Sequence, residues 1–375
     1  MKRLLLINSV CGIGSTGRIC ADIAHEYGAN GYEVRIAYGR KDTVGEGTEK
    51  YAVRIGKDLD VRLHALYTRI TDKHGLGSIR ATKWFLKWAD EYDPDILWLH
   101  NIHGYYINYE LLFDWIKSRP QMEVRWTLHD CWAFTGHCSH FTYVKCDKWK
   151  TGCKDCPQKK EYPASAYHDN SEDNYLRKKR AFCGVNNLTL ITPSHWLEGL
   201  VKQSFLKEYP VEVNSNTVDK TVFKPTPSDF RKKHGIRDDQ VMILGVSSVW
   251  NVRKGFDDFL VLSKQLFEKN GDKFRVVLVG LTEEQQRTLP KDIIGITKTD
   301  SKEELAEIYT AADVFVNPTY EDTFPTVNLE AESCETRIVT YDTGGCRETI
   351  KREDSTVIPA GDMEKLYRVV AYIND

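Results

Sequence analysis

The fold is decided by the stretch Val314-Phe315-Val316-Asn317-Pro318-Thr319-Tyr320-Glu321-Asp322-Thr323-Phe324-Pro325-Thr326-Val327-Asn328-Leu329-Glu330-Ala331. It begins with a continuous apolar run, Val314–Val316, which predicts a short strand that is buried on both faces. A polar turn follows the strand, and a helix is predicted to begin near Thr326. A strand, a turn and a helix in this order form the unit of a parallel sheet with covering helices.

The same unit recurs along the chain in two series. In the first half, strands are predicted at Leu4–Ile7, Val34–Tyr38, Ile96–Leu99, Val124–Leu128 and Leu188–Ile191. In the second half, strands are predicted at Met242–Val246, Val276–Val279, Val314–Val316 and Ile338–Thr340. Helices are predicted between them at Arg18–Tyr27, Tyr109–Ser118, Phe256–Lys269 and Lys302–Ala311. We therefore expect an α/β protein with two doubly wound domains, residues 1–205 and 206–375, joined near the proline-rich segment 193–227.

The composition excludes several classes of protein. The chain has 375 residues, and 52 Lys and Arg oppose 54 Asp and Glu, so its formal net charge of −2 argues against a globally basic nucleic-acid-binding protein. No run reaches the ~18 apolar residues of a membrane span, and the run after Met1-Lys2-Arg3 is too short for a signal peptide. We therefore expect a cytoplasmic protein whose cysteines are thiols or metal ligands.

A glycine-rich loop follows the first predicted strand. Its sequence, Gly12-Ile13-Gly14-Ser15-Thr16-Gly17, has the spacing G-x-G-x-x-G, in which Gly12, Gly14 and Gly17 let backbone N–H groups approach an anion. The second predicted strand ends near Arg40 and lacks the carboxylate that usually binds a ribose, which leaves an NADP-dependent oxidoreductase as an alternative. A tight turn with close helix packing explains the glycines equally well.

Residues after two of the later strands suit a diphosphate. Arg253 and Lys254 supply adjacent cations, and the segment Phe324-Pro325-Thr326 lies where backbone amides at a helix start attract negative charge. Glu330, about one helical turn further along, is placed to accept hydrogen bonds from a ribose diol. Each residue alone fits an ordinary surface, but all are expected at one edge of the same sheet, which predicts a nucleotide site.

At this point the sequence resembles glycosyltransferase family 4. The resemblance is carried by Tyr320–Ala331, by Asp342-Thr343-Gly344-Gly345 and by Glu348, and it extends over nearly the whole chain. The stretches Asn101–Tyr105 and Leu128–Trp132 are especially similar to members that build surface polysaccharides, including colanic-acid-type enzymes. The resemblance implies the GT-B fold, in which two Rossmann-like domains face each other across a cleft. It also implies retaining transfer of a hexosyl group from a UDP- or GDP-sugar without a catalytic metal.

The resemblance assigns roles to particular residues. His129 is expected to contact the sugar near the reacting carbon, and Gly12, Gly14 and Gly17 to line the site opposite the donor diphosphate. The nucleotide is expected to be bound by Arg253, Lys254, Phe324, Pro325, Thr326 and Glu330, of which Lys254 is also expected to act in catalysis. The family commonly places seven residues between its two donor-site glutamates. Here seven residues separate Asp322 from Glu330, and eight separate Glu321 from Glu330. Both Glu321 and Asp322 are therefore candidates for the sugar-facing carboxylate, and Glu321 is favoured.

A cysteine-rich insert lies near residues 131–160. Its four cysteines have the spacing Cys138-x7-Cys146-x6-Cys153-x2-Cys156, and four thiolates satisfy tetrahedral zinc. We therefore predict a structural zinc site, with ordinary buried thiols or a disulfide pair as alternatives.

The insert is also basic, through Lys145, Lys148, Lys150, Lys154, Lys159 and Lys160. We expect it to attract an anionic membrane or a lipid diphosphate on the acceptor side. The sequence thus predicts a glycosyltransferase that acts on a saccharide or lipid-linked saccharide acceptor, peripheral to the inner face of the membrane and without a nucleic-acid partner. The alternatives are the NADP-dependent oxidoreductase and a non-catalytic, zinc-containing binding protein.

Overall fold

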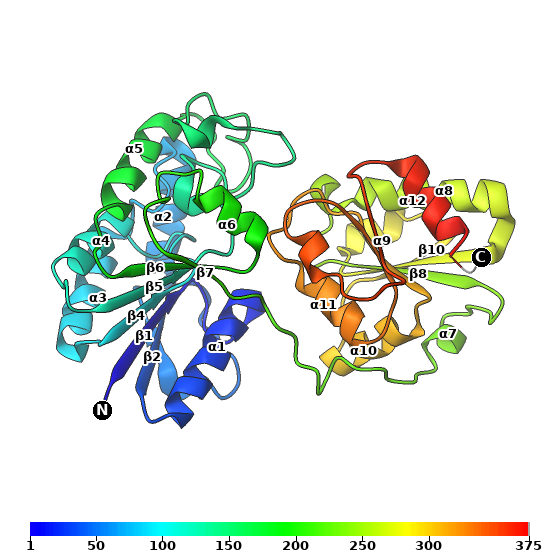
Figure 1. The fold of residues 1–375 in the computed structure, drawn as a ribbon, viewed down its shortest axis with the longest axis horizontal. Coiled ribbons are helices and arrows are strands. Elements are labelled where there is room, and N and C mark those ends of the chain that lie inside the picture. The colour runs from blue at the N-terminus through cyan, green and yellow to red at the C-terminus, as the bar shows by residue number, and fades with distance from the viewer. Residues whose placement is uncertain (374–375) are drawn as a thin grey trace. The chain divides into compact units, whose positions relative to one another are not determined.

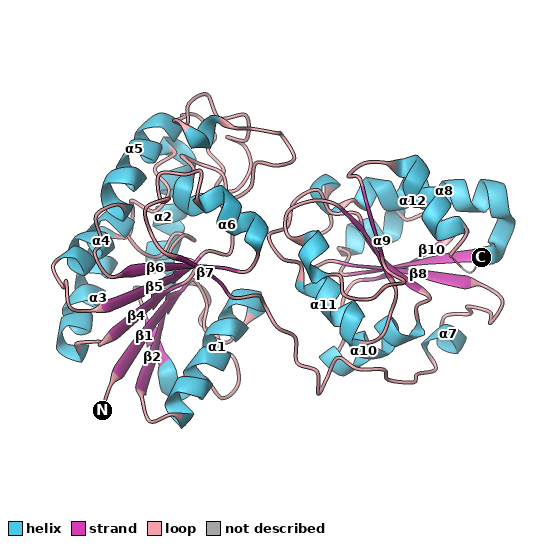
Figure 2. Cartoon of the chain, viewed as in Figure 1, coloured by secondary structure: helices cyan, strands magenta, loops and turns pink. Residues whose placement is uncertain are grey.

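The structure, a computed structural model, describes residues 1–373. The chain forms two compact units, Met1–Asn214 and Ser215–Asp375, called here the first and the second domain. Each domain has one parallel sheet with helices on both of its faces (Figure 1). Loops join the strands to the helices throughout (Figure 2). The predicted α/β class with two doubly wound domains is confirmed.

The sheet of the first domain has seven strands in the order β3-β2-β1-β4-β5-β6-β7. The strands are β1 (Arg3–Asn8), β2 (Glu33–Tyr38), β3 (Ala52–Arg54), β4 (Ile96–Leu99), β5 (Glu123–Thr127), β6 (Leu188–Thr192) and β7 (Val211–Val213). The helices are α1 (Gly14–Ala29), α2 (Asp58–Thr71), α3 (Ile79–Tyr92), α4 (Tyr109–Lys117), α5 (Ser171–Phe182) and α6 (His195–Val201). Strand β1 is apolar on both sides because Leu5 and Ile7 pack into one core while Leu4 and Leu6 pack into the core on the opposite face.

The sheet of the second domain has six strands in the order β10-β9-β8-β11-β12-β13. The strands are β8 (Val241–Val246), β9 (Phe274–Val279), β10 (Ile293–Ile296), β11 (Val314–Asn317), β12 (Ile338–Tyr341) and β13 (Thr356–Ile358). The helices are α7 (Phe230–Lys233), α8 (Phe256–Asn270), α9 (Glu283–Thr288), α10 (Lys302–Ala311), α11 (Thr326–Ser333) and α12 (Met363–Ala371). Among residues 1–373, no helix is both long and apolar enough to cross a bilayer.

Four strands were not predicted, and they are the four sheet edges: β3, β7, β10 and β13. An edge strand is covered less than a central strand, so its sequence carries a weaker apolar run. In β7 the flanking residues Val211 and Val213 are only half-buried, and Glu212 is exposed. Strand β7 pairs with β6, for example Leu190 with Val211, so the first domain continues to Asn214 and not to residue 205.

Candidate active site

Two segments of the second domain are joined through their backbones at the carboxyl ends of β8 and β11. The backbone N–H of Tyr320, after β11, donates to the carbonyl of Arg253, after β8, at 2.7 Å. Gly255 has φ +72°, and a Cβ built there would lie 2.4 Å from the carbonyl oxygen of Pro318. Only glycine allows this approach, so the turn Val252–Gly255 is held against the loop that follows β11.

This contact places the two predicted cations beside the two candidate carboxylates. The Lys254 Nζ lies 2.8 Å from Asp322 Oδ2 and donates to the Glu321 carbonyl at 3.2 Å. The Arg253 guanidinium lies 3.3 Å from Glu321 Oε2, and Glu321 is only 4% exposed. Burial by itself would lower the pKa of Lys254, but Asp322 outweighs it and raises that pKa, so the ammonium stays protonated.

Partly and fully buried hydrogen bonds fix this loop to the rest of the second domain. Asp258 on α8 accepts from the hydroxyl of Tyr320 at 2.9 Å and from the hydroxyl of Tyr341 at 2.6 Å. Asn317 donates its side-chain amide to Asn328 Oδ1 at 2.8 Å, which ties the end of β11 to helix α11. The carboxylates and cations of this site are therefore presented by a rigid framework.

Helix α11 begins at this loop, at the residue that the sequence predicts. Phe324 donates its backbone N–H to Asp322 Oδ1 at 3.2 Å, and Pro325 has no N–H to donate. Of the three residues predicted to offer backbone N–H groups to a diphosphate, Thr326 therefore has one without a hydrogen-bond partner among the described residues. Glu330, one turn along α11, accepts from the Tyr309 hydroxyl at 3.0 Å. The start of α11, with its partial positive charge, lies at the end of the sheet where Lys254 and Asp322 lie.

The glycine loop of the first domain has a packing role. Gly12 and Gly14 have φ +67° and +66°, and α1 begins at Gly14. A Cβ on Gly12 would lie 2.7 Å from Thr48 Oγ1, and one on Gly45 would lie 2.3 Å from the Gly12 carbonyl oxygen. Close approach to the segment Gly45–Thr48 therefore requires glycine at position 12, and this segment is a loop and not the helix that the tight-turn interpretation names as the packing partner. Nothing supports the oxidoreductase alternative.

His129 and Asp130 follow β5 and contact the histidines that follow β4. His129 Nε2 lies 3.0 Å from His100 Nδ1, and burial lowers the pKa of His129 to about 4, so its ring is neutral at pH 7. His103 Nε2 lies 3.0 Å from Asp130 Oδ2, while His103 Nδ1 lies 3.0 Å from the Tyr162 hydroxyl. Burial would raise the pKa of Asp130, but His103 outweighs it and the pKa falls to about 2. The contact with Tyr162 was not predicted, because only folding brings the segment after the insert to this strand end.

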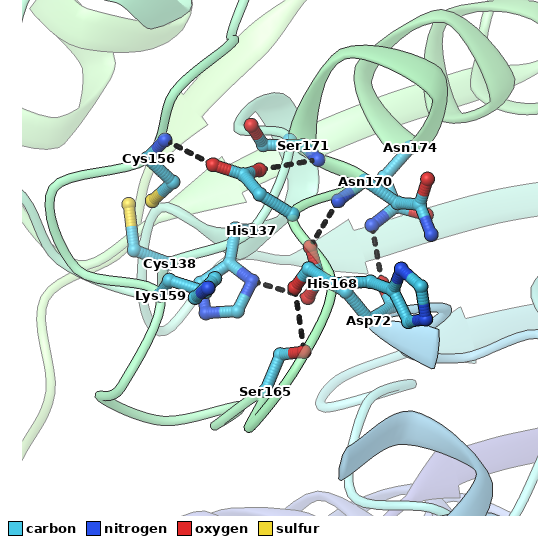
Figure 3. A network of polar contacts seen from close by, with 12 residues as sticks. Asp72, His137, Cys138, Cys156, Lys159, Ser165, His168, Asn170, Ser171 and Asn174 are labelled. Atoms are coloured by element: carbon cyan, nitrogen blue, oxygen red, sulfur yellow. Dashed lines mark hydrogen bonds and ion pairs between the residues drawn. The ribbon is translucent and has the colours of Figure 1, made fainter. Parts of the chain in front are cut away.

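A buried ion pair joins the insert to helix α2 (Figure 3). Asp72, which ends α2, lies 2.5 Å from His137 Nδ1 and accepts from the Asn170 backbone N–H at 2.8 Å. The Asn174 side chain donates to the Asp72 carbonyl at 2.5 Å. Burial would lower the pKa of His137, but Asp72 outweighs it and raises that pKa. Both partners are almost inaccessible to solvent, so the pair fixes the insert to the first domain.

The four predicted zinc ligands, Cys138, Cys146, Cys153 and Cys156, line one small cavity in the insert. The thiols of Cys138 and Cys156 are within hydrogen-bonding reach (Figure 3), and this contact lowers the pKa of Cys156 to about 7. In the part of the chain that the structure describes, no three His, Cys, Asp or Glu side chains are grouped as metal ligands. The predicted zinc site is therefore not formed here, and zinc binding stays a prediction.

Lys178 belongs to the basic run Arg177–Arg180 in the sequence, but its side chain does not lie on the surface. The side chain is buried, with Nζ donating to the carbonyls of Trp132 at 2.7 Å and Thr135 at 3.0 Å. Its ammonium lies 3.6 Å from the centroid of the Trp132 ring, and burial lowers its pKa to about 7. Lys178 thus supports the insert from within and is not part of a basic surface.

The second domain matches a known family. Residues 228–374 match the family model described as Glycosyl transferases group 1. A segment of 193 residues is 31% identical to alpha-galactosylglucosyldiacylglycerol synthase of Streptococcus pneumoniae and covers 45% of this chain and 50% of that protein. A segment of 74 residues is 38% identical to WcaC of Escherichia coli, which is named for colanic acid biosynthesis, and covers 19% of this chain and 18% of that protein. The chain therefore spans half or less of the length of these relatives.

Solved structures resemble the whole chain. Sucrose-phosphate synthase of Thermosynechococcus elongatus has a TM-score of 0.70 at 16% identity, covering 100% of this chain and 91% of that one. HepE of Anabaena, solved in complex with UDP-glucose, has a TM-score of 0.63 at 15% identity, covering 100% and 90%. At these identities the likeness shows the fold, which is the two-domain GT-B fold. The match to the group 1 glycosyl transferases thus covers the second domain, residues 228–374.

We predict that Gly344→Ala disrupts the site. Gly344 has φ +53°, and a Cβ there would lie 1.6 Å from the carbonyl oxygen of Asp322, so the loop must move. The expected loss in free energy of unfolding is about 3 kcal/mol or more. Gly235→Ala is the matched control, because Gly235 has φ +66° with nothing within 4 Å, and it should cost about 1 kcal/mol. Equal losses in urea unfolding would contradict the close contact.

We predict that Asp72→Asn destabilises the protein by about 3 kcal/mol at pH 6, because it leaves a buried His137 cation unpaired. The pKa of His137 is raised above its usual 6.5, so the pair stabilises the fold below pH 6.5 and loses its effect as the pH rises through the higher, folded pKa. The loss should therefore be smaller at pH 9 in urea unfolding. The exposed pair of Glu364 and Arg368 is the control, since Glu364→Gln should cost below about 0.5 kcal/mol at both pH values. A loss that does not change with pH would contradict the assignment.

Proposed function

We propose that the protein transfers a hexosyl group, with retention of configuration, from a UDP- or GDP-sugar to a saccharide or lipid-linked saccharide. The observation that carries the proposal is the pair of cations, Arg253 and Lys254, held beside the start of α11 in the domain that matches the group 1 glycosyl transferases. One relative named above is a synthase of a galactosylglucosyldiacylglycerol, and the other is named for colanic acid biosynthesis, which supports a role in surface polysaccharide or glycolipid assembly. HepE binds UDP-glucose, which supports a nucleotide-sugar donor.

The chemistry of the proposed transfer requires positive charge at the leaving group. The bond between the anomeric carbon and the phosphate oxygen breaks, and its electron pair passes to the diphosphate. The protonated Lys254, the Arg253 guanidinium and the start of α11 stabilise that charge, so the proposal uses no catalytic metal. The acceptor hydroxyl attacks on the face that the leaving group departs from, and its proton passes to the diphosphate oxygen.

The two candidate carboxylates take different roles in this proposal. Glu321 is buried and bound to Arg253, which suits a residue that positions a cation. Asp322 is less buried, contacts Lys254, and has the spacing to Glu330 that the family uses. We therefore assign the sugar-facing role to Asp322 in place of Glu321, which is favoured from the sequence alone. Glu330 binds the ribose diol in this assignment, with Tyr309 orienting its carboxylate. His129 contacts the sugar near the reacting carbon as a neutral hydrogen-bonding group.

We place the protein in the cytoplasm, peripheral to the inner face of the membrane. Its ten cysteines are free thiols in the structure, which fits a reducing compartment. A lipid-linked acceptor would be met at the membrane surface.

We predict that Lys254→Ala reduces transfer by about 100-fold or more, since it removes a cation from the leaving diphosphate. Glu330→Ala should weaken binding of UDP or GDP by about tenfold, since charged hydrogen bonds to the ribose are lost. Calorimetry and a transfer assay with an array of nucleotide sugars measure the two effects. Lys264→Ala and Glu303→Ala, exposed positions of the same domain, should leave both values unchanged.

Near-wild-type turnover of Lys254→Ala would overturn the assignment of the site. Stabilisation by NADP without a response to UDP or GDP would favour the oxidoreductase instead. Absence of any nucleotide response would favour the non-catalytic binding protein.

We further propose that the insert binds one structural zinc ion, because four thiols line the same cavity. The thiolates would have to approach one another to complete a tetrahedral site. The expected result is one zinc ion for each freshly reduced chain, by elemental analysis, and about half or less in Cys146→Ser. Cys183→Ser, outside the insert, is the control. Zinc-free reduced protein would show that the cysteines are ordinary thiols or, after oxidation, a disulfide pair.

A further inference from the structure

Helix α2 has its leucines and Ile70 on the outside, while Val61 packs against the core. Leu59, Leu63, Leu66 and Ile70 are 66%, 56%, 54% and 44% exposed. Their spacing of three and four residues places them on one face of the helix. A single exposed leucine is ordinary on a protein surface, but a stripe along a whole helix marks a surface that another apolar phase covers.

The opposite face of α2 is polar and buried. His64 is 2% exposed, with Nδ1 2.9 Å from Ser78 Oγ and Nε2 accepting from the Gly77 backbone N–H at 3.0 Å. Thr68 is fully buried as well. Hydrogen bonds therefore attach α2 to its own domain, and its leucines are not needed for the core. The helix is fixed with this orientation, so the stripe is a permanent feature of the surface.

Helix α3 extends this surface. Ile79 and Trp84 on α3 are 53% and 67% exposed. A cavity of about 790 Å³ is lined both by Lys57 and Asp60 at the start of α2 and by Trp84 on α3, which shows that the two helices border one surface. Exposed tryptophan and exposed aliphatic side chains on one part of a surface are typical of the region where lipid head groups meet acyl chains.

The charges around the stripe are mostly positive. Arg62 and Arg69 on α2 and Arg80, Lys83 and Lys87 on α3 are exposed, and none of them forms an ion pair within residues 1–373. The acidic side chains of α2 are already engaged: Asp58 contacts Arg54, and Asp60 accepts from the Lys57 backbone N–H at 2.8 Å. An apolar stripe between unpaired cations is complementary to a surface with apolar chains below and negative charges above.

The cysteine-rich insert and the segment after it border the same helix. The backbone N–H of Ala166 donates to the Arg69 carbonyl at 2.8 Å, and the Asn170 side chain donates to the carbonyl of Thr71. Tyr167, next to Ala166, is 74% exposed. The lysines of the insert thus belong to the same part of the first domain as the end of α2, fixed there by the ion pair of Asp72 and His137 (Figure 3).

We propose that the outer face of α2, with the adjoining part of α3, docks the protein on an anionic lipid membrane. The leucine stripe enters the boundary between head groups and acyl chains, Trp84 lies at head-group level, and the arginines and lysines contact lipid phosphates. The inference deepens the peripheral location in the proposed function and rests on that part of it. It moves the main contact from the insert, where the sequence places it, to helix α2.

The test is flotation of the full-length protein with vesicles of phosphatidylcholine, with and without phosphatidylglycerol. The wild type should bind the mixed vesicles and bind pure phosphatidylcholine at least about tenfold more weakly. The triple variant Leu63→Gln, Leu66→Gln, Ile70→Gln should lose at least about tenfold in binding to mixed vesicles. Arg62→Gln with Arg69→Gln should lose less, and the loss should shrink at high salt.

The matched control is Val261→Gln with Phe267→Gln, because these residues are 44% and 57% exposed on α8 of the second domain. The control should bind like the wild type. If the triple variant binds mixed vesicles as tightly as the wild type does, the proposed docking surface is wrong. A wild-type dimer that becomes monomeric in the triple variant, without vesicle binding by either, would show that a second copy covers the stripe.

Nucleotide binding, measured on the same samples without vesicles, separates this inference from the proposed activity. Vesicle binding that depends on the stripe, in a protein that binds no UDP or GDP, would overturn the proposed transfer and leave the docking surface standing. An unchanged circular dichroism spectrum and an unchanged urea-unfolding curve of the triple variant show that the substitutions have not unfolded the first domain.

Discussion

The candidate site depends on the backbone contact between the turn that ends at Gly255 and the loop after β11. The hydrogen bond from the Tyr320 N–H to the Arg253 carbonyl and the absence of a side chain at Gly255 bring the two segments together. The two ion pairs of the site follow from that approach. Lys254 reaches Asp322, Arg253 reaches Glu321, and both pairs lie where α11 begins. A site of this kind is preorganised, because backbone geometry and not flexible side chains sets its distances.

The first domain is organised differently, by buried polar contacts. The ion pair of Asp72 and His137 ties the cysteine-rich insert to α2, and Lys178 ties the insert to α5 through two carbonyls. The contact of His103 with Asp130 joins the segments that follow β4 and β5. Such groups are stable in the interior only when each finds a partner. Since polar groups attach α2 to the domain, its leucines are left for the surface. The arrangement that fixes the insert also exposes the apolar stripe.

The central strands were predictable and the edges were not. Strand β4 matches its predicted range of Ile96–Leu99, and α10 matches Lys302–Ala311, because residues buried on both faces show continuous apolar runs or a clear helical period. Strands β3, β7, β10 and β13 lie at sheet edges and are partly exposed, so their sequences resemble loops. In the site, the residue types were predictable, but the pairing was not. Glu321 and Asp322 are neighbours in the chain, and only the loop geometry sends one to Arg253 and the other to Lys254.

The sequence by itself determined the class of fold and the residues that gather after β8 and β11. These features follow from local patterns: apolar runs, helix starts, and cations or carboxylates at fixed distances along the chain. Only the tertiary structure decided which side chains are buried, which pairs form, and which face of α2 meets the solvent. Lys178 and the leucines of α2 illustrate the reason. Burial and exposure depend on what packs against a residue from distant parts of the chain, and no local pattern records that.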